Sequence, residues 1–281
     1  MRLATICLAI AIASVIVPGV GDAEESCGRY ELDVRFFPAF HLPAAVKVTG
    51  RTGSGELTIT YGNSRTLGHR KERLLLPREI SQAFCLRLAQ LAALASGTDD
   101  RPIIDGITVE GAFDREGAPP FTFVARSPRE RTQPVEYAIA DAIFALFEAG
   151  PVSCELNEAL EQLALYFEFA SPARIVTEPA ATLRIYGFIG QAHDALLTRL
   201  LGSLPTDQPL QIDFTNYYAV HTTPPPRLQR LIMDLAANQR VKWLAGSEFA
   251  GTLRRFGVDK KRIETVEGPN CPLQRTRFAR R

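Results

Sequence analysis

The stretch Tyr30-Glu-Leu-Asp-Val-Arg-Phe36 alternates apolar and charged side chains without a break. Such alternation is typical of a β-strand that turns one face to the core and the other to water. Residues 46–48 and 57–61 repeat the period, and residues 52–55, Thr-Gly-Ser-Gly, have the composition of a hairpin turn. We therefore expect this part of the chain to form an antiparallel sheet.

Two helices are predicted to follow these strands. Apolar residues recur every three or four positions from about 77 to 95, and again from about 134 to 149. This spacing is the period of a helix with one buried face. Between the helices, residues 107–123 alternate like a hairpin with its turn at 114–120. Residues 24–150 are therefore predicted to form an α+β domain, with a mostly antiparallel sheet and two helices on one face.

The pair Gly150-Pro151 marks a natural boundary, and Ser153 can cap a helix that extends to about residue 169. Leucine and aromatic residues occupy most sides of this helix, which is typical of a helix buried on most sides. We expect residues 151–171 to be a connecting helix that packs against both halves of the chain. An exposed surface for a partner protein is the alternative interpretation.

In residues 172–268, short apolar strands alternate with amphipathic helices, which predicts a parallel or mixed α/β sheet with right-handed crossovers. The last 13 residues, 269–281, form a basic tail. The predicted strands are 174–178, 183–189, 210–214, 241–245 and 263–266, and the predicted helices are 192–204, 225–238 and one capped by Ser247.

Three stretches of this second half, 183–189, 212–216 and 249–258, together with the order of the elements, resemble a STAS domain, the fold of anti-sigma-factor antagonists. The resemblance covers about residues 173–267, a third of the chain. In that family a kinase phosphorylates a serine that follows an aspartate after the central strand. His221-Thr222 stand at the matching positions here. The resemblance therefore implies an α/β fold for this half and not the family's phosphorylation switch.

The first 23 residues predict export. Met1-Arg2 precedes an apolar run from Leu3 to Val17, and Gly21-Asp-Ala23 supplies the small residues of a signal-peptidase site. The run is shorter than the roughly 20 residues that a bilayer-spanning helix needs. We expect cleavage after Ala23 and a periplasmic, soluble product with no stable membrane span.

After cleavage four cysteines would remain, and an even number in an oxidising compartment predicts two disulfides. Three pairings are possible. Pairs Cys27–Cys85 and Cys154–Cys271 would each staple one half of the chain. The alternative is that one or more of the four stay free in the core.

The net charge of +1 gives the chain no overall field that would recruit nucleic acid. The sequence contains no P-loop, dinucleotide-binding pattern, nucleophile elbow or zinc-ligand spacing. It therefore predicts no metal and no cofactor and favours a protein that is not an enzyme. Two basic segments, residues 65–73 and 275–281, are interpreted as a charged strand edge and a mobile tail; contact with an anionic surface or an acidic partner is the alternative.

The candidate ligand site is the loop 216–223, which joins the end of a central strand to the start of a helix, where α/β sheets favour ligands. Pro224-Pro-Pro226 weakens this site because prolines donate no N–H. The alternative is that Thr222 or Thr223 only caps the helix while the tyrosines pack. The candidate side chains are Asn216, Thr222 and Thr223 for hydrogen bonds, Tyr217 and Tyr218 for stacking, and His221 as a general acid or base.

These observations predict a non-catalytic recognition module that binds an unidentified protein of the cell envelope. A small-molecule-binding protein or a hydrolase that uses the 216–223 loop is the alternative.

Overall fold

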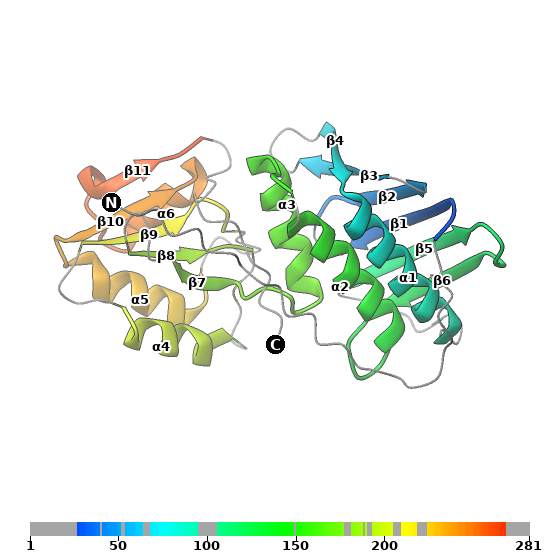
Figure 1. Cartoon of the computed structure of the whole chain (residues 1–281). Coiled ribbons are helices and arrows are strands. Elements are labelled where there is room, and N and C mark those ends of the chain that lie inside the picture. The colour runs from blue at the N-terminus through cyan, green and yellow to red at the C-terminus, as the bar shows by residue number, and fades with distance from the viewer. Residues whose placement is uncertain are drawn as a thin grey trace, which may run out of the picture.

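The structure is a computed structural model, and it contains two β-sheets and six α-helices among its described residues (Figure 1). The predicted signal peptide, the basic tail and residues 218–223 lie outside the described residues. None of the described helices is long and apolar enough to cross a membrane. The described residues are 27–39, 41–51, 54–63, 68–94, 106–148, 150–176, 181–187, 189, 193–204, 209–217 and 224–267.

The first sheet has six strands in the order β4-β3-β2-β1-β5-β6, and every neighbouring pair is antiparallel. The alternating stretch 30–36 lies in the central strand β1, with its apolar side chains buried and its charged side chains on the opposite face. The predicted antiparallel sheet is thus confirmed. The strands are β1 (Tyr30–Pro38), β2 (Ala44–Arg51), β3 (Ser54–Asn63), β4 (Gly68–Leu76), β5 (Ile107–Arg115) and β6 (Phe121–Arg126).

Two helices, α1 (Arg78–Leu94) and α2 (Pro134–Glu148), cover the apolar face of this sheet (Figure 1). Their bounds agree with the predicted helices to within one residue. The other face is polar, with an exposed ion pair of 2.6 Å between Lys47 and Glu31. Strand β4 is an edge strand, and its exposed His69, Arg70 and Lys71 form the charged edge that the sequence predicted.

Helix α3 (Cys154–Tyr166) begins where the sequence predicted, because the Ser153 hydroxyl oxygen accepts a hydrogen bond of 3.1 Å from the Leu156 amide. The same hydroxyl donates to Glu72 of β4, whose carboxylate also accepts from the Tyr61 hydroxyl at 2.6 Å. These bonds fasten the start of α3 to the first sheet. The helix ends at Tyr166, earlier than predicted, in a turn described below.

The second sheet is mixed, with the order β11-β10-β9-β8-β7. The pair β7–β8 is antiparallel and the other neighbours are parallel, as the alternation of strands and helices predicted. One detail differs, because Gly246 and not Ser247 is the N-cap of the last helix. The elements are β7 (Ala173–Val176), β8 (Thr182–Ile185), α4 (Asp194–Gly202), β9 (Leu210–Phe214), α5 (Pro226–Ala236), β10 (Val241–Ala245), α6 (Ser247–Arg255) and β11 (Ile263–Thr265).

A buried ionic network joins α3 to the second sheet. Glu161 of α3 pairs with Arg184 of β8 at 3.0 Å and with Arg174 of β7 at 2.9 Å. Arg184 also pairs with Asp213, its direct neighbour on β9, at 3.1 Å. The side chains of Glu161, Arg184 and Asp213 are only 1%, 2% and 4% exposed. Since α3 also contributes Leu156, Leu160 and Leu163 to the first hydrophobic core, this helix contacts both sheets.

The disulfide Cys27–Cys85 ties the start of β1 to α1 and confirms the first predicted pair. Cys154 is disulfide-bonded as well. Cys271, its predicted partner, lies outside the described residues, so that pairing stays a prediction.

Candidate functional site

The structure describes two residues of the predicted 216–223 site, Asn216 and Tyr217; the remaining candidates, Tyr218, His221, Thr222 and Thr223, lie outside the described part of the chain. Asn216 is buried. The ring of Tyr217 packs against Phe249 at a centroid distance of 4.8 Å, and burial raises the pKa of Tyr217 to about 12. This tyrosine therefore packs in the second core, as the alternative interpretation held.

The alternative interpretation was wrong about the cap of the following helix. Pro225 is the N-cap of α5 and makes no side-chain cap bond, so neither Thr222 nor Thr223 is the N-cap. Three consecutive prolines place the helix start at Pro226, because a fixed φ and a missing N–H suit the first helical position. Whether the loop 216–223 binds a ligand stays a prediction.

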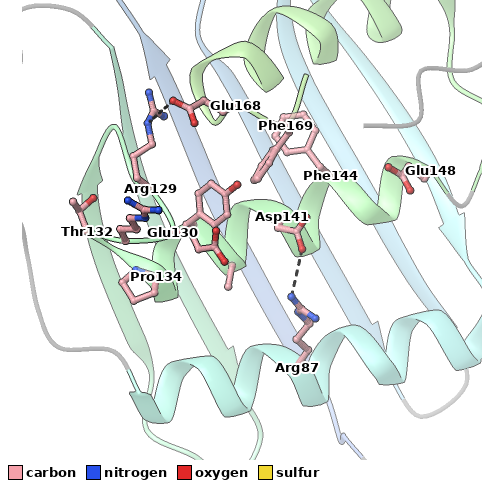
Figure 2. Close-up of a pocket in the computed structure, with 13 residues that line it drawn as sticks. Arg87, Arg129, Glu130, Thr132, Pro134, Asp141, Phe144, Glu148, Glu168 and Phe169 are labelled. Carbon is pink, nitrogen blue, oxygen red and sulfur yellow. Dashed lines mark hydrogen bonds and ion pairs between the residues drawn. The ribbon is translucent and has the colours of Figure 1, made fainter. Parts of the chain in front are cut away.

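A groove of about 900 Å³ lies instead on the helical side of the first sheet (Figure 2). It follows α2, with α1 on one side and the turn after α3 on the other. The segment between β6 and α2 closes one end. The lining residues are Arg87 from α1, residues 129–132 and Pro134, then Tyr137, Ala138, Asp141, Phe144 and Glu148 from α2, and Glu168 and Phe169 after α3.

The floor of the groove is the outer stripe of α2. Tyr137, Ala138, Asp141 and Glu148 are spaced at helical intervals along this stripe, and each is only partly exposed. The stripe is recessed because α1 and the turn after α3 flank it, and Arg87 reaches across from α1 to pair with Asp141 at 3.4 Å (Figure 2). A helix whose outermost side chains are recessed offers a channel along its axis to another chain or ligand.

The second wall is the turn that ends α3. The Phe169 amide donates to the Ala164 carbonyl at 3.0 Å and the Glu168 amide donates to the Leu165 carbonyl at 3.3 Å, the two bonds of a Schellman motif. Glu168 occupies the left-handed position of this motif with a φ of 61°, where glycine is usual. A side chain at such a position costs about 1–2 kcal/mol. Here the side chain makes an ion pair with Arg129 at 3.3 Å across the end of the groove (Figure 2).

Aromatic rings lie between the two ion pairs. The Tyr137 and Phe169 rings are 4.9 Å apart between centroids, and the Phe144 and Phe169 rings are 5.2 Å apart. Phe144 and Phe169 are buried, whereas Tyr137 is partly exposed to the groove. Burial raises the pKa of Tyr137, and the carboxylates of Glu130, Asp141 and Glu168 raise it further, while the Arg129 guanidinium opposes them.

The chemistry of this groove suits binding. Among its described lining residues there is no histidine, cysteine or serine, and the carboxylates of Asp141 and Glu168 are each paired with an arginine. Within the described ranges, no three His, Cys, Asp or Glu side chains are placed to hold a metal ion. Two ion pairs beside a partly exposed aromatic ring can hold a ligand through apolar contact and charge.

Sequence reasoning missed this groove because two helices and two connecting segments that are far apart in the chain build it. One local signal was present: residues 129–133, Arg-Glu-Arg-Thr-Gln, place alternating charges directly before a helix that is otherwise apolar. The period of α2 predicted its buried face correctly but could not show that its polar stripe would be recessed.

A partly buried histidine contacts the last residue of α3, next to the same wall. His41 Nδ1 lies 2.8 Å from the Tyr166 hydroxyl oxygen, and the Tyr166 carbonyl accepts a hydrogen bond from Arg129. Burial lowers the pKa of His41 to about 4. The histidine and the groove residue Arg129 therefore contact the same last residue of α3.

We expect His41 to make the protein sensitive to acid. The unfolded chain binds a proton at His41 near pH 6.5, whereas the folded state resists protonation down to about pH 4. The stabilisation is therefore complete above pH 6.5 and is lost as the pH falls toward 4, by a total on the order of 3 kcal/mol. Urea denaturation at pH 7 and at pH 4.5 gives the free energy of unfolding at each pH. Between these two values the unchanged protein should lose about 2–3 kcal/mol more of this free energy than its His41→Gln variant.

The matched control is His69→Gln, because His69 is exposed on β4. Between pH 7 and pH 4.5, His69→Gln should lose as much free energy of unfolding as the unchanged protein. Equal losses in the unchanged protein and in His41→Gln would contradict the prediction.

Comparison with known proteins adds no family to this description. No family model matches the chain. No curated protein and no solved structure was found that matches it. The function of the groove is therefore argued from its own geometry and chemistry.

Proposed function

We propose that this protein is an exported, non-catalytic recognition protein of the cell envelope that binds a segment of a partner protein in the groove over α2. The observation that carries the proposal is the groove itself, in which an aromatic side chain lies between two ion-paired walls. Protein interfaces commonly combine an apolar centre with a polar rim, and tyrosine and arginine are enriched in them.

The dimensions of the groove support a polypeptide segment as the occupant. The helix that forms its floor has 15 residues, which corresponds to a length of about 22 Å. Recognition of a segment laid along a helix-lined groove is a recurring mode of protein binding, in which anchors spaced along the segment contact the floor. Asp141 and Arg87 at mid-length, and Glu168 and Arg129 at one end, can set the register of such a segment.

The covalent chemistry of the chain supports export. The disulfide Cys27–Cys85 and the bonded Cys154 are typical of proteins that fold in an oxidising compartment, which for a chain with the predicted signal peptide would be the periplasm. The mixed sheet of the second half is compatible with the STAS-like fold, which we retain as part of the proposal. The buried network of Glu161 and Arg184 would then hold this half against the first half, which contains the groove.

Site-specific photo-crosslinking tests this function. A photoreactive phenylalanine analogue replaces Thr132, an exposed residue at the groove, and in a matched control it replaces Thr122, an exposed residue of β6 away from the groove. We expect position 132 to capture one defined segment of one envelope protein, and position 122 not to capture it. Capture should be lost in Ala138→Arg, which fills the floor, and a synthetic peptide of the captured segment should bind the purified protein.

Equal labelling at positions 132 and 122, or no protein product at position 132, would contradict the proposed function. Capture of a small molecule at position 132 would instead assign the groove to a soluble ligand. Thermal melting of Ala138→Arg by circular dichroism must show an unchanged fold, so that a lost crosslink reports on the groove.

A further inference from the structure

We propose that the groove selects a basic side chain of the bound segment, a lysine or an arginine, and holds it beside the ring of Tyr137. This inference rests on the proposed function and specifies the chemistry of its ligand. It follows from the balance of charges along the groove and from the position of the one partly exposed aromatic ring.

The charges of the lining favour a cation. The lining contains four carboxylates, from Glu130, Asp141, Glu148 and Glu168, and three guanidiniums, from Arg87, Arg129 and Arg131. Two of the guanidiniums are already committed, since Arg87 pairs with Asp141 at 3.4 Å and Arg129 pairs with Glu168 at 3.3 Å. Without displacing a carboxylate from one of these pairs, an anionic ligand could use only Arg131, whereas a cation can share the four carboxylates without breaking a pair.

The surroundings of Tyr137 locate the cation. This ring lines the groove, and the buried Phe169 supports it from below at 4.9 Å. Burial raises the pKa of its hydroxyl most, and the carboxylates of Glu130, Asp141 and Glu168 raise it further while only the Arg129 guanidinium lowers it, so carboxylates outnumber guanidiniums around the ring. An ammonium or guanidinium group beside such a ring gains both from the carboxylates and from the quadrupole of the ring.

The cation is assigned to a partner's side chain because the groove continues beyond the ring. Ala138 is partly exposed and lines it as apolar surface on the same helix, next to the charged positions, while Phe144 is buried beneath the lining. A lysine or arginine side chain combines a long apolar stem with a charged end, and this combination matches an apolar floor beside carboxylates. A small inorganic cation would leave this apolar surface in contact with water.

The test uses two probes on the full exported chain, Nα-acetyl-lysine amide and its uncharged analogue Nα-acetyl-norleucine amide. Binding is followed by the shifts of the α2 amide resonances in ¹H–¹⁵N spectra at 20 mM and 200 mM salt. We expect the lysine probe to bind in the millimolar range, about three- to tenfold more tightly than the norleucine probe at low salt. This difference should shrink at the higher salt concentration.

Three variants check the position of the cation. Tyr137→Leu and Glu130→Gln should each weaken binding of the lysine probe about threefold or more, while Tyr137→Phe should keep it, because the ring is retained. Glu110→Gln, on the opposite face of the sheet, is the matched control and should have no effect. Glu130 is exposed and Tyr137 is partly exposed, so we expect these changes to preserve the fold, which circular dichroism of each variant checks.

Equal affinity for the two probes, or unchanged binding of the lysine probe in Glu130→Gln and Tyr137→Leu, would overturn the inference. If photo-crosslinking at position 132 still captures a protein segment, the proposed function survives that failure. If instead the lysine probe binds as expected but no segment is captured, the cation site stands and the proposed function fails. Binding that is observed only after removal of residues 275–281 would show that the chain's own arginine-rich tail competes for the groove, which would overturn the assignment to a partner.

Discussion

Arg184→Met should lower the free energy of unfolding by about 3–5 kcal/mol, more than any other single substitution that we predict here. Arg184 lies between Glu161 of α3 and Asp213 of β9, and all three side chains are almost completely buried. Methionine has a similar length but no charge, so both carboxylates would remain in the interior with one counter-charge fewer. The effect therefore comes mainly from the desolvated carboxylates that remain.

The network should also respond as a unit. Arg174 and Arg184 both lie near the ring of the buried Tyr186, at 5.5 Å and 5.9 Å from its centroid. Because Glu161 pairs with both arginines, removing it after Arg184 has been removed destroys fewer contacts than removing it first. The Glu161→Gln and Arg184→Met effects should thus sum to about 1–3 kcal/mol more than the effect of the double variant.

Urea denaturation followed by the fluorescence of Trp243 measures these effects. Trp243 is the one tryptophan of the chain and is fully buried in the second sheet. Lys47→Met is the control, because it removes an exposed ion pair with Glu31 and should change stability by less than about 1 kcal/mol. A loss below 1 kcal/mol for Arg184→Met, or strict additivity with Glu161→Gln, would show that the network does not stabilise the contact between α3 and the second sheet.

Removal of the disulfide Cys27–Cys85 should have the second large effect. The bond joins residues separated by 58 positions, and closing a loop of that length in the unfolded chain contributes about 4 kcal/mol of stability in the chain-entropy model. Both cysteines are buried, at 2% and 0% exposure, so the Cys27→Ala/Cys85→Ala variant also leaves small voids in the core. We expect it to lose about 4–5 kcal/mol.

The double alanine variant is preferable to a reducing agent because Cys154 is disulfide-bonded too, and reduction would break both bonds. Urea denaturation followed by far-ultraviolet circular dichroism gives the loss of stability. A thiol titration of the denatured, unreduced exported chain should give close to zero free thiols before the substitution and after it. A double variant as stable as the unchanged protein, or two free thiols in the unchanged chain, would contradict this prediction.

Local periodicity predicted most of the secondary structure correctly. The alternation at 30–36 identified the central strand, and the apolar stripes located α1 and α2 to within one residue. These signals are local because a strand or helix with one buried face must repeat its own geometric period in the sequence. The strand β4 was harder, since an edge strand with a charged surface carries only a weak alternation.

Helix ends were predicted less well. Ser153 was recognised as a cap because its hydroxyl acts on the amide three residues ahead, which is a local interaction. The end of α3 was placed too late. Glu168 adopts the left-handed conformation that ends the helix, whereas a glycine at that position would have indicated the end in the sequence. The start of α5 lies within one residue of its predicted position, but the alternative cap at Thr222 or Thr223 was wrong, since a run of prolines sets the start.

The sequence alone determined the periods of the strands and helices and the α+β class, because these follow from local geometry and from residue chemistry. It left three disulfide pairings open, and the structure shows the pair Cys27–Cys85. Only the tertiary structure brought Arg87, Arg129, Asp141 and Glu168 to the walls of one groove, and Glu161, Arg184 and Asp213 into one buried network. Charges of opposite sign pair at 3–4 Å only when packing places their helices and strands side by side, and no spacing along the chain encodes that distance.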